Sequence, residues 1–262
     1  MSSNISKSIL VIGAFVLAYV GVFMSFETED GSYVGVGPLL ESINCPKMWK
    51  SLCKFIISLV VLVPVAWIVS KKENVLKAFG VSRGLVKALA FCGVCVLPML
   101  ICGLIFGTFE YSWETFIAYA LSAGIVEEGL YRSFLFGMLY RYCNWRFWFA
   151  ALPTAIIFSL GHFYQAHDWL SCLQVFGVTV FGSIFFSWLY VAWGYNLFVP
   201  IFLHTFMNAM WGMFQVDDVS NSVGNVATNT GRVLTLLLAV FITCWYRKRN
   251  GEEHYFIVSN NE

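Results

Sequence analysis

Charged residues are scarce in this chain, because Asp, Glu, Lys and Arg make up only 12% of its 262 residues and the net charge is +1. A typical soluble domain is about 25% charged and about 45–50% apolar, whereas this chain is 59% hydrophobic and 18% aromatic. The scarcity of charge excludes an ordinary soluble domain, and the small net charge gives no electrostatic reason to expect a nucleic-acid partner. The composition predicts an integral membrane protein surrounded by membrane lipid.

Internal repeats, low-complexity tracts and a separate soluble domain are also absent from the sequence. A membrane-spanning helix needs about 20 mostly apolar residues, and we interpret the first apolar run as such a helix, not as a cleaved signal peptide. We expect an all-α polytopic membrane protein with about eight transmembrane helices, forming a single domain over residues 1–262 with a motif-bearing core near 115–215. The predicted spans lie near residues 9–26, 52–70, 86–107, 115–139, 146–164, 172–193, 196–215 and 231–246.

The eight cysteines are scattered and most of them lie in apolar runs. Cys92 and Cys95 form a CxxC pair, but redox or zinc chemistry favours such a pair at a polar, accessible site. We therefore interpret both as packing residues. Cys45 and Cys53 flank a predicted membrane boundary and could be bridged outside the cell, although their spacing alone does not establish this.

The distribution of lysine and arginine predicts the orientation of the chain, because cytoplasmic segments are enriched in both. A cytoplasmic N-terminus places eleven of these residues inside and four outside. The inner residues are Lys7, Lys71, Lys72, Lys77, Arg83, Lys87, Arg141, Arg146, Arg247, Lys248 and Arg249, and the outer ones are Lys47, Lys50, Lys54 and Arg232. We expect both termini in the cytoplasm.

The fourth predicted span contains three charged residues, Glu127, Glu128 and Arg132, within the stretch GIVEEGLYRSFLFG. A central Arg, Lys or Asp costs roughly 2.5–3.5 kcal/mol on an insertion scale, so such groups must face protein or water and not lipid. Glu128 and Arg132 are four residues apart in the order that favours a helical ion pair. Glu127 points about 100° away around the helix and is left without this partner.

Two further polar pairs occur in other predicted spans. Phe158 and His162 lie one helical turn apart in the fifth span, and His204 and Asn208 lie one turn apart in the seventh. A single histidine in a membrane is often a packing residue, but two histidines, an asparagine and an unpaired glutamate together favour a functional site.

These three motifs, in this order, resemble those of the CAAX-protease and bacteriocin-processing family (also called CPBP or Abi). That family comprises intramembrane glutamic endopeptidases related to the type 2 CAAX prenyl endopeptidases. The resemblance covers residues 127–208, with no departure at a motif position. It implies an endopeptidase that hydrolyses membrane-associated or lipidated proteins or peptides.

The resemblance also implies roles for the residues of the three motifs. Glu127 would be the general base that activates water, and His162 would help to hold the same water. His204 and Asn208 would form the oxyanion hole. Arg132 would order the site through Glu128, and no cofactor would be required.

Three other interpretations remain open. Glutamates and histidines also bind zinc, although the sequence lacks the HExxH motif. A proton-coupled transporter would use intramembrane Glu and His as a relay, but Asn208 does not titrate and favours an oxyanion donor. A non-catalytic immunity or binding protein would not need the complete set of motifs. The compact chain favours the bacterial cell (inner) membrane, and the sequence does not choose between prenylated CAAX tails, bacteriocin-type peptides and other substrates.

Overall fold

The computed structural model describes residues 2–29, 31–215 and 223–252. The helices of the first part are α1 (Ser2–Ala18), the π-helix η1 (Tyr19–Phe23), α2 (Val36–Ser42), α3 (Lys47–Val69), α4 (Val75–Ala78), α5 (Leu85–Cys95) and α6 (Leu97–Phe106). They are followed by α7 (Trp113–Thr115), η2 (Phe116–Leu121), α8 (Ser122–Glu127), η3 (Glu128–Phe136), α9 (Gly137–Tyr142), α10 (Phe147–Leu160), the 3-10 helix η4 (Phe163–Gln165), α11 (Trp169–Ala192), α12 (Phe198–Met213) and α13 (Val226–Arg249). Two short antiparallel pairs, β1 (Phe26–Glu27) with β2 (Tyr33–Val34) and β3 (Thr108–Phe109) with β4 (Phe214–Gln215), lie in the connections.

Each predicted span corresponds to helical structure, and the chain is an all-α, multi-pass integral membrane protein. In the described residues, five helices are long and apolar enough to cross a membrane, namely those over Asn4–Phe23, Lys47–Val69, Leu85–Phe106, Trp169–Ala192 and Val226–Arg249. The fourth predicted span is a helical run from α7 to α9 in which η2 and η3 are π-helical. α10 and α12 have only 14 and 16 residues.

Two helix boundaries differ from the prediction. The third predicted span is divided into α5 and α6 at Val96, because Pro98 cannot donate the backbone hydrogen bond that a continuous helix requires. The fifth predicted span was extended to residue 164, but α10 ends at Leu160 and a turn follows at Gly161. His162 therefore lies beyond the last turn of α10 and not within it.

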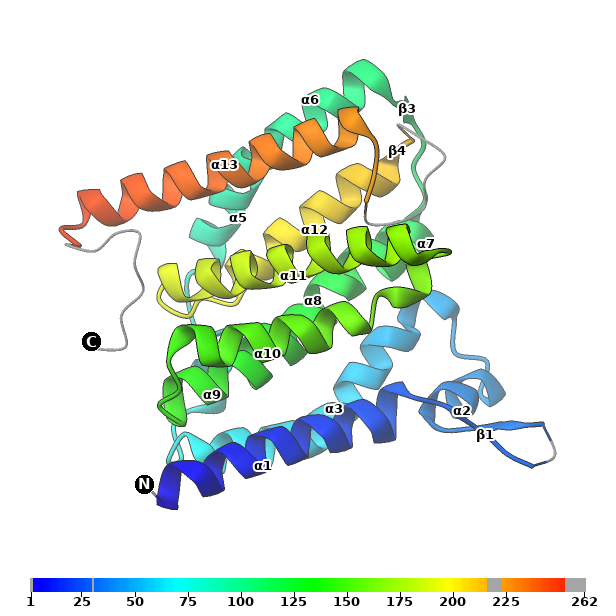
Figure 1. Cartoon of the computed structure of the whole chain (residues 1–262), viewed down its shortest axis with the longest axis vertical. Coiled ribbons are helices and arrows are strands. Elements are labelled where there is room, and N and C mark those ends of the chain that lie inside the picture. Colours follow the sequence, from blue (N-terminus) through cyan, green and yellow to red (C-terminus); the bar gives the residue numbers. More distant parts are fainter. Residues whose placement is uncertain (1, 30, 216–222, 253–262) are drawn as a thin grey trace.

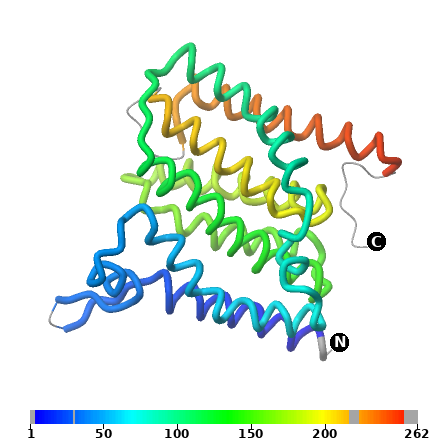
Figure 2. The backbone as a smooth tube through the Cα atoms, turned by 180° about the vertical axis from the view of Figure 1, so that it is seen from behind, coloured from blue at the N-terminus to red at the C-terminus, as the bar shows by residue number. Residues whose placement is uncertain are grey.

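The long helices lie side by side with their connections at two opposite ends of the bundle (Figure 1). The N-terminal end of α1 and the C-terminal end of α13 share one end, and both short strand pairs lie at the other (Figures 1 and 2). The C-terminal ends of α3 and α13 lie at this same end of the bundle (Figures 1 and 2), and the predicted inner cations Lys71, Lys72 and Arg249 follow or end these two helices in the chain. The positions of these residues are consistent with the predicted orientation, and which face is cytoplasmic remains a prediction.

Two buried apolar clusters form the core. The first joins α1, α3, η3, α9 and α10, and the second joins α5, α11, α12 and α13. Cys92 and Cys95 are buried in the second cluster, which agrees with their interpretation as packing residues. Cys45 and Cys53 are free thiols with their Sγ atoms 4.0 Å apart.

Candidate active site

The charged residues of the fourth span lie where its backbone changes from α8 to the π-helix η3, between Glu127 and Glu128. π-helical turns within α-helices are rare and are frequently found at functional sites. All residues of η3 are buried. The local structure therefore places Glu128 and Arg132 inside the protein, while Glu127 retains a side chain that is 26% exposed.

Glu128 and Arg132 form the predicted ion pair. Arg132 Nε lies 3.2 Å from Glu128 Oε2, and the two side chains are 0% and 1% exposed. The rings of Phe158 and Phe186 cover the guanidinium, with centroids 4.5 and 5.6 Å from Arg132 Cζ. The Nε–H is not aligned for a hydrogen bond to that oxygen, so the charges and the aromatic faces supply the stabilisation.

Glu128 also binds His204 on α12. His204 Nδ1 lies 2.7 Å from Glu128 Oε1. Because a carboxylate paired with arginine can only accept hydrogen bonds, we assign the Nδ1 proton to His204 as the donor. The ring of Phe186 stacks on the imidazole, with 5.4 Å between the two ring centroids and an interplanar angle of 22°. Glu128 and Phe186 together fix the orientation of His204 and turn its Nε2 toward Glu127.

Glu127 faces His204 without a direct hydrogen bond. Glu127 Oε2 lies 3.9 Å from His204 Nε2, which is longer than a hydrogen bond. A single water can bridge two polar atoms at this separation. The arrangement thus combines one partly exposed carboxylate with an imidazole that a second, buried carboxylate holds in place.

Gly124 allows this close approach of α8 to α12. A Cβ atom at Gly124 would lie 2.1 Å from Thr205 Oγ1 and 2.9 Å from the Ile201 carbonyl oxygen. A larger residue would therefore separate the two helices that carry Glu127 and His204. Gly124 precedes Glu127 by three residues, and a glycine so close to charged residues in a predicted span is a sequence signal of this close helix contact.

Asn208 and His162 are less directly connected to this group. Asn208 Nδ2 donates to the Tyr119 carbonyl oxygen at 3.2 Å, which leaves its second amide proton for another acceptor. His162 Nδ1 lies 2.8 Å from the Phe158 carbonyl oxygen, and the centroids of the His162 and Phe158 rings are 4.4 Å apart. Across the described residues no hydrogen bond or ion pair joins His162 to Glu127, so its expected role in holding the same water remains a prediction.

The site therefore brings Glu127, Glu128, Arg132 and His204 together, with Asn208 one turn along α12. Phe186 and Tyr119 also take part in this site and were not predicted from the sequence. Phe186 is one of 25 phenylalanines and carries no local signal, and Tyr119 contributes through its backbone. Within residues 2–29, 31–215 and 223–252, no group of three or more His, Cys, Asp or Glu side chains is placed to hold a metal ion.

Comparison with known proteins identifies the segment that contains all of these residues. Residues 109–210 match the family described as type II CAAX prenyl endopeptidase Rce1-like. This segment resembles the Rce1-like family. The Rce1-like segment includes the helical run from α7 to α9, α10, α11 and most of α12, and so contains every candidate residue.

A curated relative supports this assignment. The chain is 34% identical over 104 residues to a protein of Bacillus subtilis (strain 168) named "Putative membrane peptidase YdiL". The matched part is 40% of this chain and 38% of that relative, so the match spans well under half of either protein. No solved structure matches the chain.

Proposed function

We propose that this chain is an intramembrane endopeptidase in which Glu127 activates water for hydrolysis of a membrane-associated or lipidated peptide. The Rce1-like family and the relative named as a membrane peptidase support a CAAX-type membrane protease. The observation that carries the glutamate mechanism is the 3.9 Å separation of Glu127 Oε2 from His204 Nε2. It sets a partly exposed base beside a donor whose position is fixed.

The buried charges support a protonated His204 in this mechanism. Glu127 and Glu128 carry two negative charges and Arg132 carries one positive charge, so a neutral His204 would leave one charge uncompensated in apolar surroundings. An imidazolium balances the group, donates from Nδ1 to Glu128 and leaves Nε2–H directed toward the reacting atoms. Glu128 and Arg132 then act through His204 as positioning residues.

The reaction follows from these positions. Glu127 takes a proton from water, and the water oxygen attacks the carbonyl carbon of the scissile peptide bond. His204 Nε2–H and the second amide proton of Asn208, one helical turn away, stabilise the oxyanion of the tetrahedral intermediate. Glu127 returns its proton to the leaving nitrogen when the C–N bond breaks. Water is consumed, a carboxyl group and an amine are formed, and the base is regenerated.

A glutamine substitution tests this proposal. Glu127→Gln preserves the shape of the side chain but cannot accept a proton, so cleavage should fall by orders of magnitude. The measurement compares peptide termini in membranes of cells that carry the wild type or the variant, using mass spectrometry. Glu114→Gln is the matched control, because Glu114 is an exposed glutamate in the first turn of the same helical run.

The outcomes separate the competing interpretations. The metal-independent glutamate mechanism is supported if new peptide termini are lost in Glu127→Gln but not in Glu114→Gln. These termini should still form after prolonged chelation of metal ions. Wild-type cleavage by a folded Glu127→Gln protein would refute the role of Glu127. Loss of cleavage on chelation, with recovery on adding zinc, would instead assign the histidines to a metal site.

A further inference from the structure

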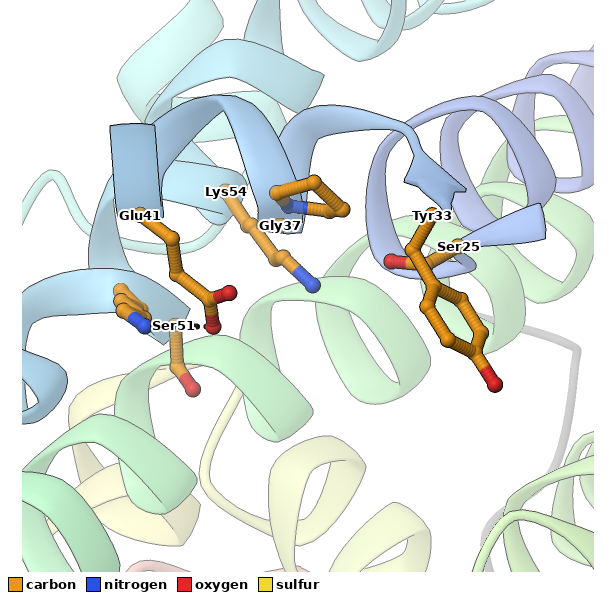
Figure 3. Close-up of a pocket in the computed structure, with 8 residues that line it drawn as sticks. Ser25, Tyr33, Gly37, Glu41, Ser51 and Lys54 are labelled. Atoms are coloured by element: carbon orange, nitrogen blue, oxygen red, sulfur yellow. Dashed lines mark hydrogen bonds and ion pairs between the residues drawn. The ribbon is translucent and has the colours of Figure 1, made fainter. Parts of the chain in front are cut away.

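A second polar region lies away from the candidate active site. It is formed by the connection from η1 through the β1–β2 hairpin to α2 and by the beginning of α3. It contains a cavity of about 320 Å³, which is within the usual size range of ligand sites. Figure 3 shows the side chains around it, which come from four successive segments of the chain. The lining residues are Ser25, Tyr33, Gly37, Pro38, Glu41, Lys50, Ser51 and Lys54.

The cavity has an excess of positive charge. Lys50 Nζ forms an ion pair with Glu41 Oε1 at 2.7 Å. Lys54 Nζ donates to the Phe23 carbonyl oxygen at 3.2 Å, and no carboxylate of the described residues lies within 4.0 Å of it. One half-buried ammonium group therefore has no direct ion pair among the described residues, although the Glu41 carboxylate is near enough to interact with it through space.

The space in front of this ammonium group is kept open by Gly37. A Cβ atom at Gly37 would lie 3.2 Å from Lys54 Nζ and 3.0 Å from Ser25 Oγ. The hydroxyls of Ser25 and Ser51 line the same cavity and can donate hydrogen bonds to an anion, whereas the Tyr33 hydroxyl donates to Glu27 Oε2 at 3.5 Å. Lys50 also lies in the first turn of α3, where the helix dipole favours negative charge.

The surroundings of the cavity indicate the membrane boundary. Trp49, which is exposed on the first turn of α3, is of the type that lies at the level of lipid headgroups. The exposed surface of α3 then becomes apolar at Ile56 and Val60. A ligand with an anionic head and an apolar tail matches this change from polar to apolar surface along one helix.

We propose that this cavity binds the phosphate of an anionic phospholipid headgroup. Lys54 neutralises the phosphate, the hydroxyls of Ser25 and Ser51 donate hydrogen bonds to it, and the acyl chains lie along the apolar face of α3. Because Glu41 forms an ion pair with Lys50, it reduces the contribution of Lys50 to the affinity for the phosphate. This site is separate from the proposed peptidase activity and does not depend on it.

Native mass spectrometry of the purified full-length protein tests the proposal with phosphatidylglycerol and phosphatidylcholine as probes. Lys54→Gln should weaken phosphatidylglycerol binding by about fivefold, because it removes the cation that contacts the phosphate in the cavity. Glu41→Gln should strengthen binding, because it releases Lys50 from its ion pair. Lys47→Gln is the matched control, since Lys47 is exposed on the same helix end but does not line the cavity, and it should leave binding unchanged.

Competition experiments identify the source of the phosphate. Inorganic phosphate, which lacks acyl chains, should displace phosphatidylglycerol at least fivefold more weakly than the unlabelled lipid does. Equal competition by inorganic phosphate, or preferential displacement by a peptide with a free terminal carboxylate, would overturn the lipid assignment. Equal binding of both lipids, or wild-type binding by Lys54→Gln with an unchanged melting temperature, would also overturn it.

Discussion

The candidate active site and the cavity near α3 each contain a glutamate paired with a cation, but the two pairs differ in their surroundings. Lys50 and Glu41 are 2.7 Å apart, and the Glu41 side chain is 66% exposed. Arg132 and Glu128 are farther apart, at 3.2 Å, and are almost completely buried. The shorter pair is expected to contribute less to stability, because water already solvates its charges. Each charge of the buried pair depends strongly on its partner, because burial removes the water that would otherwise solvate it.

The largest effect should come from breaking the buried pair. Arg132→Ala leaves Glu128 buried with only His204 as a partner and removes the cation that Phe158 and Phe186 cover. Removing one partner of a buried pair costs about 3–5 kcal/mol. The measurement is the thermal unfolding of purified protein in detergent. Lys50→Ala, whose partner Glu41 is exposed, serves as the counterpart with little expected change.

Equal melting temperatures for Arg132→Ala, Lys50→Ala and the wild type would contradict the contrast between the two pairs. Arg132→Lys gives a further distinction. It retains the charge but loses the planar guanidinium between two rings, so it should recover part of the stability and not all of it.

The sequence predicted the buried pair because both partners lie on one helix, where a spacing of four residues fixes their proximity. It also predicted the helical segments, because apolar runs of sufficient length have few alternatives in a membrane. The contact between Glu128 and His204 joins residues 76 positions apart and depends on which helices are neighbours. The position of the Phe186 ring over Arg132 and His204 and the end of α10 before His162 likewise depend on how the helices pack. The periodicity of the local sequence does not encode this packing.

A smaller effect is expected from separating the two helices that form the site. Gly124→Ala would place a Cβ atom against Thr205 and the backbone of Ile201. Overpacking of this kind typically costs about 1–3 kcal/mol. Cleavage should decrease more than stability alone would explain, because the Glu127–His204 separation would increase. The measurement is the cleavage assay at a temperature where the variant remains folded.

Gly177→Ala is the matched control, since a Cβ atom there meets no other atom within 4 Å. Normal cleavage by Gly124→Ala would show that the site tolerates a wider helix spacing. The close approach of α8 and α12 would then be a packing feature only.

The smallest effect should arise from an ion pair at the membrane surface, where the carboxylate of Glu73 lies between α3 and α4. Hydrogen bonds from Lys77 and from Tyr142 lower the pKa of Glu73 below its usual value. A carboxylate with a lowered pKa stabilises the folded state above its unfolded pKa of about 4.3, and this contribution is lost as the pH falls through the folded pKa.

Glu73→Gln should therefore be less stable than the wild type at pH 7 by no more than about 1 kcal/mol. Below about pH 4 the difference in melting temperature between the two proteins should shrink. Glu29→Gln is the control, because Glu29 is an exposed glutamate between β1 and β2, and it should match the wild type throughout. A constant difference across this pH range would show that Glu73 acts through its shape and not through its charge, and the contrast between exposed and buried pairs would then rest on Arg132 and Glu128 alone.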